Sequence, residues 1–165
     1  MKEVRVEKLT LESFSPFGYF SNMINPDMSH FGNPPIEFYR DMLQLNLSDS
    51  SIASFSICRV EKRPEVIDTI EYHSMCAEGI LPLDSNVLIH TAPATKKGVI
   101  PLDDFRVFSV PKGTLIILKP GVWHHAPFLD DSNQANVLIV LPERTYANDC
   151  IVEKLSEEDK IKIIK

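Results

Sequence analysis

The stretch FRVFSVPKGTLIIL, residues 105–118, decides the fold class of this sequence. It holds two short runs rich in β-branched and aromatic residues, at 105–110 and 114–118, with a turn sequence at 111–113 between them. Such runs predict β-strands, because these side chains fit the pleated surface of a sheet. A second turn sequence, KPG at 119–121, follows at once. We therefore expect short, closely spaced strands in this part of the chain.

The same pattern continues in both directions along the chain. Further runs of strand length are VRVEKL, IEFYRD, LQLNL, IASFSICRV, VIDTIEYH, EGILPL, NVLIHTA, NVLIVL and CIVEKL. Turn sequences such as SPFG, FGNPP, NLSDSS, EKRPE, PLDSN and DDSNQ separate them. Strands that are interrupted this often by turns predict an all-β fold, as an antiparallel sandwich or barrel.

Two short helices are expected at the periphery of this fold. Thr10 can cap a turn that runs through residues 12–14, and the sequence at 156–159 opens like a capped carboxy-terminal helix. The polar stretch from Asn25 to Pro35 has no strand pattern. It predicts a long loop that could cover a site.

Composition and charge exclude several classes of protein. A chain of 165 residues with 44% hydrophobic and 24% charged residues predicts one globular domain over residues 1–165. The net charge of -6 argues against a nucleic-acid or anionic-membrane surface. No apolar run approaches the ~20 residues of a membrane span. Three cysteines without C-x-x-C spacing, and an amino terminus without a signal-peptide pattern, predict a cytoplasmic protein.

The segment IEYHSMCAEG, residues 70–79, carries the first group of candidate metal ligands. Glu71 and His73 are two residues apart, so in an extended strand both side chains point to the same face. Glu78 has the wrong parity for a straight strand. A turn through residues 74–77 would fold the next strand back as an antiparallel neighbour and return Glu78 to the face of His73.

The second group of candidates lies about fifty residues downstream, in VWHHAPF. Successive strand residues face opposite sides, so only one of His124 and His125 can point into the same cavity as Glu71, His73 and Glu78. Imidazoles together with carboxylates suit a divalent transition metal such as Mn, Fe, Ni or Zn. Such a set leaves coordination positions open, which predicts a catalytic site rather than a structural one.

Each of these residues also has a simpler interpretation. Glu71 and His73 could form a surface ion pair on an edge strand, and Glu78 could be a solvated carboxylate after a turn. The His124-His125 pair could be partly buried imidazoles bonded to backbone carbonyl groups. Two further histidines, His30 and His90, fall outside any motif and are interpreted as surface or loop residues.

The spacing Glu-x-His-x4-Glu, followed downstream by Gly-x6-Pro-Gly-x2-His, is similar to the two-part metal motif of cupins, with Glu71 where the first histidine usually falls. Among cupins, the sequence resembles the ureidoglycolate lyase family, also called ureidoglycolate hydrolases. The residues that carry this resemblance run in the family's order over nearly the full length: SFSPFG (13–18), IEFYRDM (36–42), RPEVIDTIEYHSMCAEGILPL (63–83), VWHHAPF (122–128) and NDCIVEKLSEED (148–159).

Three positions depart from the family pattern. Glu78 stands where the family usually has glutamine, and Leu118-Lys119 stand where it has a Tyr-His pair. Ala126 separates His125 from a proline that in the family follows the second histidine directly. These departures keep two alternatives open. One is a cupin enzyme that isomerises or oxygenates another small polar metabolite, and the other is a non-catalytic cupin that binds a small ligand.

The resemblance implies a double-sheet jelly roll that cleaves ureidoglycolate to glyoxylate and urea with the help of a divalent transition metal. It further implies a homodimer with a small-molecule substrate. Four residues are then the expected metal ligands: Glu71, His73, Glu78 and His124. The expected groups for proton transfer and for binding the substrate carboxylate are Glu71, His125, Lys119 and Arg144.

Overall fold

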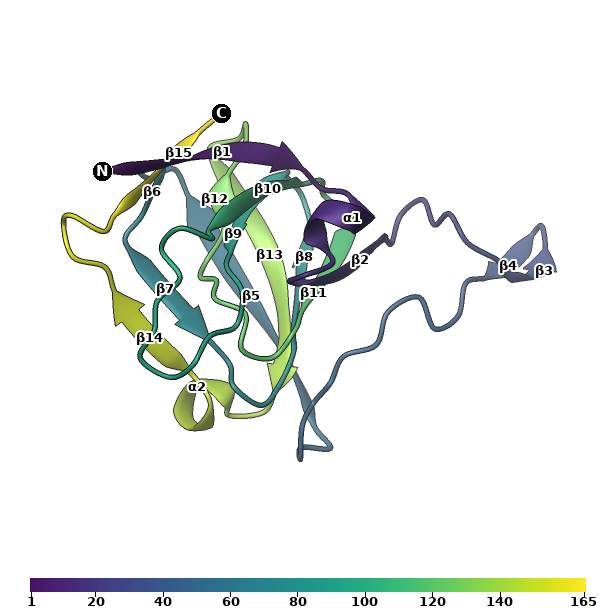
Figure 1. Cartoon of the computed structure of the whole chain (residues 1–165). Coiled ribbons are helices and arrows are strands. Elements are labelled where there is room, and N and C mark those ends of the chain that lie inside the picture. The colour runs from purple at the N-terminus through teal and green to yellow at the C-terminus, as the bar shows by residue number, and fades with distance from the viewer.

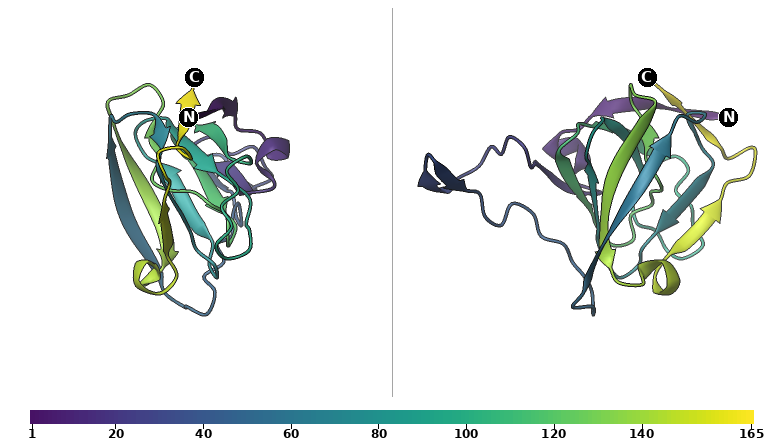
Figure 2. Two further views of the ribbon diagram at one scale, coloured as in Figure 1. Left: turned by 60° about the vertical axis from the view of Figure 1, so that its left-hand side comes forward. Right: turned by 180° about the vertical axis from the view of Figure 1, so that it is seen from behind.

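Two curled β-sheets packed face to face make up the body of the protein in the computed structural model, which describes residues 1–165 (Figure 1, Figure 2). The first sheet has the strand order β12 (Phe128–Leu129), β9 (Val87–Thr91), β10 (Arg106–Val110), β1 (Lys2–Lys8), β15 (Ile161–Ile164) and β6 (Val66–Ile67). The second has the order β2 (Gly18–Asn22), β11 (Thr114–Leu118), β8 (Glu78–Pro82), β13 (Gln134–Pro142) and β5 (Ala53–Glu61).

Two small sheets and two single-turn helices complete the fold. The small sheets pair β7 (Thr69–Tyr72) with β14 (Ile151–Lys154), and β3 (Phe31–Asn33) with β4 (Ile36–Phe38). The helices are α1 (Leu11–Phe14) and α2 (Thr145–Asn148). The predicted all-β, double-sheet jelly roll with short peripheral helices is therefore confirmed. The structure contains no helix that is long and apolar enough to span a membrane.

Strand β9 of the six-stranded sheet is buried along its whole length because the sheet is covered on both faces at this strand. On β9, Val87 and Ile89 enter the core between the two large sheets, whereas Leu88 enters a second core on the opposite face. His90 follows the parity of Leu88 and is only 1% exposed. The interpretation of His90 as a surface or loop residue was therefore wrong.

The predicted turns are present, and one predicted helix is not. Gly113 and Gly121 adopt φ angles of +76° and +80° at the two ends of β11, as tight turns require. Thr10 Oγ1 accepts a hydrogen bond from the Ser13 amide at 3.1 Å and caps α1. Residues 156–159 form only a turn and lead into β15, because Ile161 buries its side chain when this strand pairs with β1.

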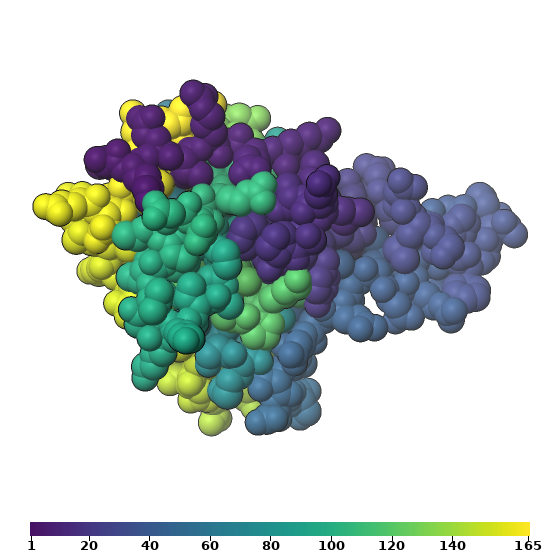
Figure 3. All heavy atoms as spheres, in the orientation of Figure 1, coloured from purple at the N-terminus to yellow at the C-terminus, as the bar shows by residue number.

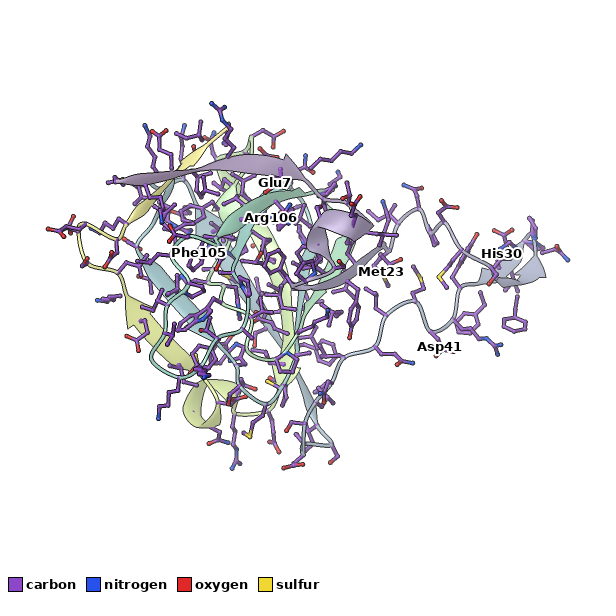
Figure 4. All side chains as sticks on the ribbon, in the orientation of Figure 1. Glu7, Met23, His30, Asp41, Phe105 and Arg106 are labelled. Carbon is purple, nitrogen blue, oxygen red and sulfur yellow. The ribbon has the colours of Figure 1, made fainter.

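The amino-terminal strand is attached to the body by charged groups as well as by sheet pairing. β1 lies parallel to both of its neighbours, β10 and β15. Arg106 of β10 donates from Nε to Glu7 Oε1 at 2.8 Å and from Nη1 to the Ser13 carbonyl at 2.9 Å (Figure 4). This one guanidinium therefore links β1, β10 and α1.

Residues 25–43 form an arm that projects away from the body and carries the β3–β4 hairpin at its tip (Figure 1, Figure 3). Met23 lies at its base, and His30 and Asp41 lie far out along it (Figure 4). The stretch from Asn25 to Pro35 is therefore part of an arm that reaches outward and does not fold over the body as a lid would.

Candidate metal centre

Three buried side chains converge at one point between the two large sheets and β7. His73, Glu78 and His124 each offer a ligand atom, and these atoms lie within 4.8 Å of one another. Glu78 Oε2 is 3.1 Å from His73 Nε2 and 2.7 Å from His124 Nε2. The three residues are 2%, 6% and 2% exposed. A shared coordination sphere is therefore within the reach of all three groups.

Both histidines are held in the orientation that metal-binding imidazoles need. His73 Nδ1 donates to the Asp149 carbonyl oxygen at 2.6 Å, and His124 Nδ1 donates to the Val122 carbonyl oxygen at 2.8 Å. Since a carbonyl oxygen can only accept, each Nδ1 carries a proton, and each Nε2 is directed toward Glu78, where it can serve as a ligand atom once it is unprotonated. This outer hydrogen bond is the usual partner of a metal-bound imidazole.

The donor set fits a divalent transition metal. Two imidazole nitrogens and one carboxylate oxygen suit Mn, Fe, Ni or Zn, and no cysteine takes part. Three protein ligands leave positions open for other molecules, as catalytic sites do. The three side chains present therefore match the predicted cofactor class.

Backbone pairing between two distant segments brings the histidines together. The Glu71 amide donates to the His124 carbonyl at 2.6 Å, and the His124 amide donates to the Glu71 carbonyl at 2.8 Å. The Gly121 amide donates to the His73 carbonyl at 2.6 Å. Residues 121–124 thus lie antiparallel to residues 71–73, which explains why ligands some fifty positions apart in the sequence meet.

Glu78 reaches the centre by a different route from the one predicted. The expected hairpin between the strands that carry His73 and Glu78 was wrong, because β7 pairs with β14 whereas β8 pairs with β11 and β13. The chain instead crosses from one sheet to the other through residues 74–77. This crossing turns the Glu78 carboxylate toward His73.

The buried carboxylate is kept charged by its two imidazole neighbours. Burial alone would raise the pKa of Glu78, but His124 and His73 outweigh it and lower that pKa to about 2. Burial alone would lower the pKa of His124, but the Glu78 carboxylate outweighs it and raises that pKa. Glu78 therefore stays a carboxylate, which is the form that can bind a cation.

A cavity of about 210 Å³ opens beside Glu78. Glu71, His125 and Tyr146 contribute its other polar groups. Burial lowers the pKa of His125, and burial followed by the charges of Glu78 and Glu71 raises the pKa of Tyr146. The rest of the wall consists of Cys58, Ile80, Ala126, Pro127 and Ile139. The cavity thus combines a carboxylate, an imidazole and a phenol in a small space next to the centre.

The structure directs His124 and His125 to different places, as predicted for adjacent strand residues. It places Glu71 differently from the prediction that this residue is a metal ligand. His124 enters the cluster, and His125 lines the adjacent cavity. Glu71 is not one of the three convergent groups. Its Oε2 accepts a hydrogen bond from the Cys150 thiol at 3.3 Å, and the carboxylate lines the cavity wall. Glu71 is thus positioned to face a bound molecule.

The two expected cationic residues do not reach this cavity. Lys119 Nζ donates to the Ser15 carbonyl oxygen at 2.6 Å, which holds the ammonium against the end of α1. Arg144 precedes α2, and its side chain is 78% exposed, with Nε 3.9 Å from Glu143. Lys119 follows the end of β11 and Arg144 lies just beyond the end of β13, but the end of a strand does not determine where a long side chain points.

Sequence reasoning missed two residues around the centre. Tyr146 lies in α2, outside any strand pattern, and no motif pointed to it. Asp149 falls in the stretch 148–159 that carries the family resemblance, but it was not among the predicted site residues, although its carbonyl oxygen orients His73. A backbone acceptor leaves no residue-type signal in a sequence, so this contact to His73 could not have been predicted.

Comparison with known proteins identifies relatives along almost the whole chain. A family model described as ureidoglycolate lyase matches residues 1–163. The ureidoglycolate lyase of Rhodobacter capsulatus is 26% identical over 126 residues, which cover 75% of this chain and 77% of that protein. The protein of the same name in Pseudomonas aeruginosa is 25% identical over 166 residues, covering 98% and 95%. The one in Escherichia coli K12 is 23% identical over 159 residues, covering 95% and 97%.

Solved structures similar to this chain include two enzymes. A dTDP sugar isomerase from Desulfovibrio desulfuricans G20 has a TM-score of 0.48 and 15% identity, and the match covers 87% of each chain. An oxalate decarboxylase from Bacillus subtilis, in a study of its Mn(II) centres, has a TM-score of 0.42 and 15% identity, and the match covers 75% of this chain and 33% of that one.

Proposed function

Because this chain belongs to the ureidoglycolate lyase family, we propose that it cleaves ureidoglycolate to glyoxylate and urea at the His73–Glu78–His124 cluster. One observation carries the proposal. Two imidazoles with backbone-bonded Nδ1 atoms meet a charged carboxylate next to a small cavity, and that cavity is lined by a second carboxylate and a further imidazole. The full-length family match supports the same lyase chemistry.

His73, Glu78 and His124 would hold the divalent ion. When bound, such an ion polarises substrate oxygen atoms as a Lewis acid and lowers the pKa of a hydroxyl group. The protein contributes the fixed orientation of the two Nε2 atoms and the charge of Glu78. It also supplies a cavity with a partly apolar wall beside these ligand atoms.

The reaction needs one proton to leave the substrate and one to return. Ureidoglycolate carries a carboxylate, a hydroxyl and a urea nitrogen on one carbon. Loss of the hydroxyl proton forms the C=O bond of glyoxylate, the C–N bond breaks, and the departing nitrogen is protonated to give urea. We assign proton removal to the Glu71 carboxylate and proton delivery to His125, because both line the cavity beside Glu78.

The direct test compares urea release from ureidoglycolate with and without the protein, together with elemental analysis of the purified chain. We expect release above the spontaneous rate and a stoichiometric transition metal that a His73→Ala variant loses. A His30→Ala variant on the arm is the matched control and should keep both. Release no faster than the spontaneous rate, measured on metal-loaded protein, would exclude the lyase function.

A second variant tests whether Glu71 acts as the general base or as a metal ligand. Glu71→Gln should lower kcat about 10²- to 10⁴-fold, the usual contribution of a general base, and leave the metal content unchanged. Loss of the metal from this variant would instead make Glu71 a ligand, in addition to His73, Glu78 and His124.

One observation favours a second candidate function. No lysine or arginine lines the cavity, although ureidoglycolate carries a carboxylate. A cupin that acts on another small polar metabolite, or only binds one, would need no such cation. In the assay above, a bound metal without urea release would support this alternative.

We also propose that the chain forms a homodimer through its arm. Phe31, Ile36 and Phe38 at the tip are 50%, 76% and 62% exposed. Exposed apolar groups gathered on a projecting segment mark a contact surface. The number of residues in the arm is close to the roughly 20 to 30 residues that each partner contributes to a standard interface.

We also propose a cytoplasmic location for this protein. The three free cysteines support this proposal.

A further inference from the structure

We infer that Asp149 is a positioning residue, which holds the imidazole of His73 and the segment leading to Glu78 in the geometry of the centre. The inference rests on the proposed metal site. Asp149 is buried and follows α2, more than seventy positions from the residues it contacts. It uses both its backbone and its side chain, and each makes a separate contribution.

The backbone of Asp149 acts on His73. Its carbonyl oxygen accepts the Nδ1 proton of His73 at 2.6 Å, which selects one tautomer and directs Nε2 to the centre. The Asp149 amide donates to the Thr145 carbonyl at 2.8 Å. The end of α2 thus fixes where the acceptor for His73 lies.

The side chain of Asp149 acts on the crossing between β7 and β8. Oδ1 accepts from the Ser74 amide at 2.7 Å and from the Ser74 hydroxyl at 2.6 Å. Oδ2 accepts from the Met75 amide at 2.9 Å and from the Cys76 amide at 3.4 Å. Three successive backbone N–H groups, which have no partner in a sheet, are therefore satisfied by one carboxylate.

This arrangement couples two of the three ligands. His73 immediately precedes the clamped segment, and Glu78 follows it after Ala77, whose amide donates to the Asn46 carbonyl at 2.9 Å. Without the carboxylate, three buried or partly buried donors would have to find other acceptors, and the segment would relax. His73 and Glu78 would then move relative to each other.

Asparagine at this position keeps the shape but not the hydrogen bonds. One side-chain oxygen can still accept, but the amide NH₂ would face backbone N–H donors, and donors do not pair with donors. Asp149→Asn therefore tests the carboxylate itself. The matched control is Asp84→Asn, because Asp84 also accepts from a backbone amide, that of Asn136 at 2.9 Å, but lies at an exposed turn.

Two measurements on the full chain decide the question. The first is the affinity for Zn²⁺, measured by competition with a chromogenic chelator. The second is the ¹⁵N NMR spectrum of the histidine rings in metal-free protein, which reports which nitrogen of His73 carries the proton. We expect the affinity of Asp149→Asn for Zn²⁺ to fall about 10- to 100-fold, which is the usual effect of removing a group that orients a metal ligand. We also expect this variant to show a mixture of His73 tautomers. Asp84→Asn should change neither.

Guanidinium unfolding of both variants separates a local effect from loss of the fold. If Asp149→Asn does not fold, Ser74→Ala removes a single hydroxyl contact and should give a smaller loss in the same direction. An Asp149→Asn protein that folds, binds Zn²⁺ like the unmodified chain and keeps one His73 tautomer would overturn the inference. If the unmodified chain itself does not bind Zn²⁺, the proposed metal site fails, and the metal-free NMR spectrum alone decides the role of Asp149.

Discussion

The buried imidazole of His90 should limit how stable this protein is in acid. Both of its ring nitrogens lack a hydrogen-bond partner, and the rings of Phe105 and Phe128 lie at centroid distances of 6.2 and 5.7 Å. Burial holds the pKa of His90 well below its ordinary value of 6.5, and the nearby charges of His125, His124 and Arg63 lower it further. A proton on this ring would have no acceptor.

The size of the effect follows from proton linkage. Below about pH 6.5 the unfolded chain binds a proton at residue 90 and the folded chain does not. The free energy of unfolding therefore falls as the pH falls, by about 1.4 kcal/mol for each pH unit in that range. Between pH 7.5 and 5.5 this single residue should remove about 1.4 kcal/mol, since its titration in the unfolded state begins only near 6.5.

Replacing His90 with leucine removes this titration. Guanidinium unfolding of the unmodified chain and of His90→Leu, each at pH 7.5 and 5.5, should show the difference between them moving by about 1.4 kcal/mol in favour of leucine at the lower pH. The value at one pH depends on how leucine packs, so only the change with pH tests the titration. The control is a His30→Asn variant, which removes an exposed histidine on the arm and should leave the pH dependence of unfolding unchanged. Equal pH dependence in the unmodified chain and His90→Leu would show that the folded protein protonates His90 as readily as the unfolded one does, and would refute the reasoning.

Three further predictions concern the framework and the arm. Phe14→Ala should cost about 3 to 5 kcal/mol in denaturant unfolding, because the ring is fully buried in the core between the large sheets. Thr10→Ala should cost about 1 kcal/mol in the same measurement, because the Ser13 amide loses its acceptor at the start of α1. The double variant Ile36→Ser, Phe38→Ser should be monomeric by sedimentation equilibrium at concentrations where the unmodified chain is dimeric; a monomeric unmodified chain would contradict the proposed role of the arm.

The local part of the fold could be predicted from the sequence because local signals determine it. Gly113 and Gly121 mark turns that need positive φ angles, and the Thr10 hydroxyl marks a cap. The run NVLIHTA was also informative. An apolar strand without alternation is covered on both faces, so this pattern alone could have predicted that His90 is buried.

Strand pairing could not be predicted in the same way. The segments that carry His73 and Glu78 are close in sequence, and a hairpin was the simplest connection between them. The structure instead places them in different sheets, because the side chains of β7 and β8 bury against different cores: Ile70 enters the second core and Ile80 the first. Which core a strand joins depends on the whole chain, and this information is absent from a window of ten residues.

The departures from the family pattern acquire a physical meaning in the structure. Leu118 is buried in the first core and Lys119 is bonded at the end of α1, so no group of theirs replaces a Tyr-His pair at the cavity. The cavity instead contains Glu71 and Glu78, with no lysine or arginine in its wall. Two carboxylates in a small, partly apolar space repel an anionic ligand. An anionic substrate is therefore expected to bind only when the centre holds a cation, and metal-free protein should bind glyoxylate more weakly than metal-loaded protein in a direct titration. Equal binding in the two forms would mean that the substrate carboxylate is recognised elsewhere.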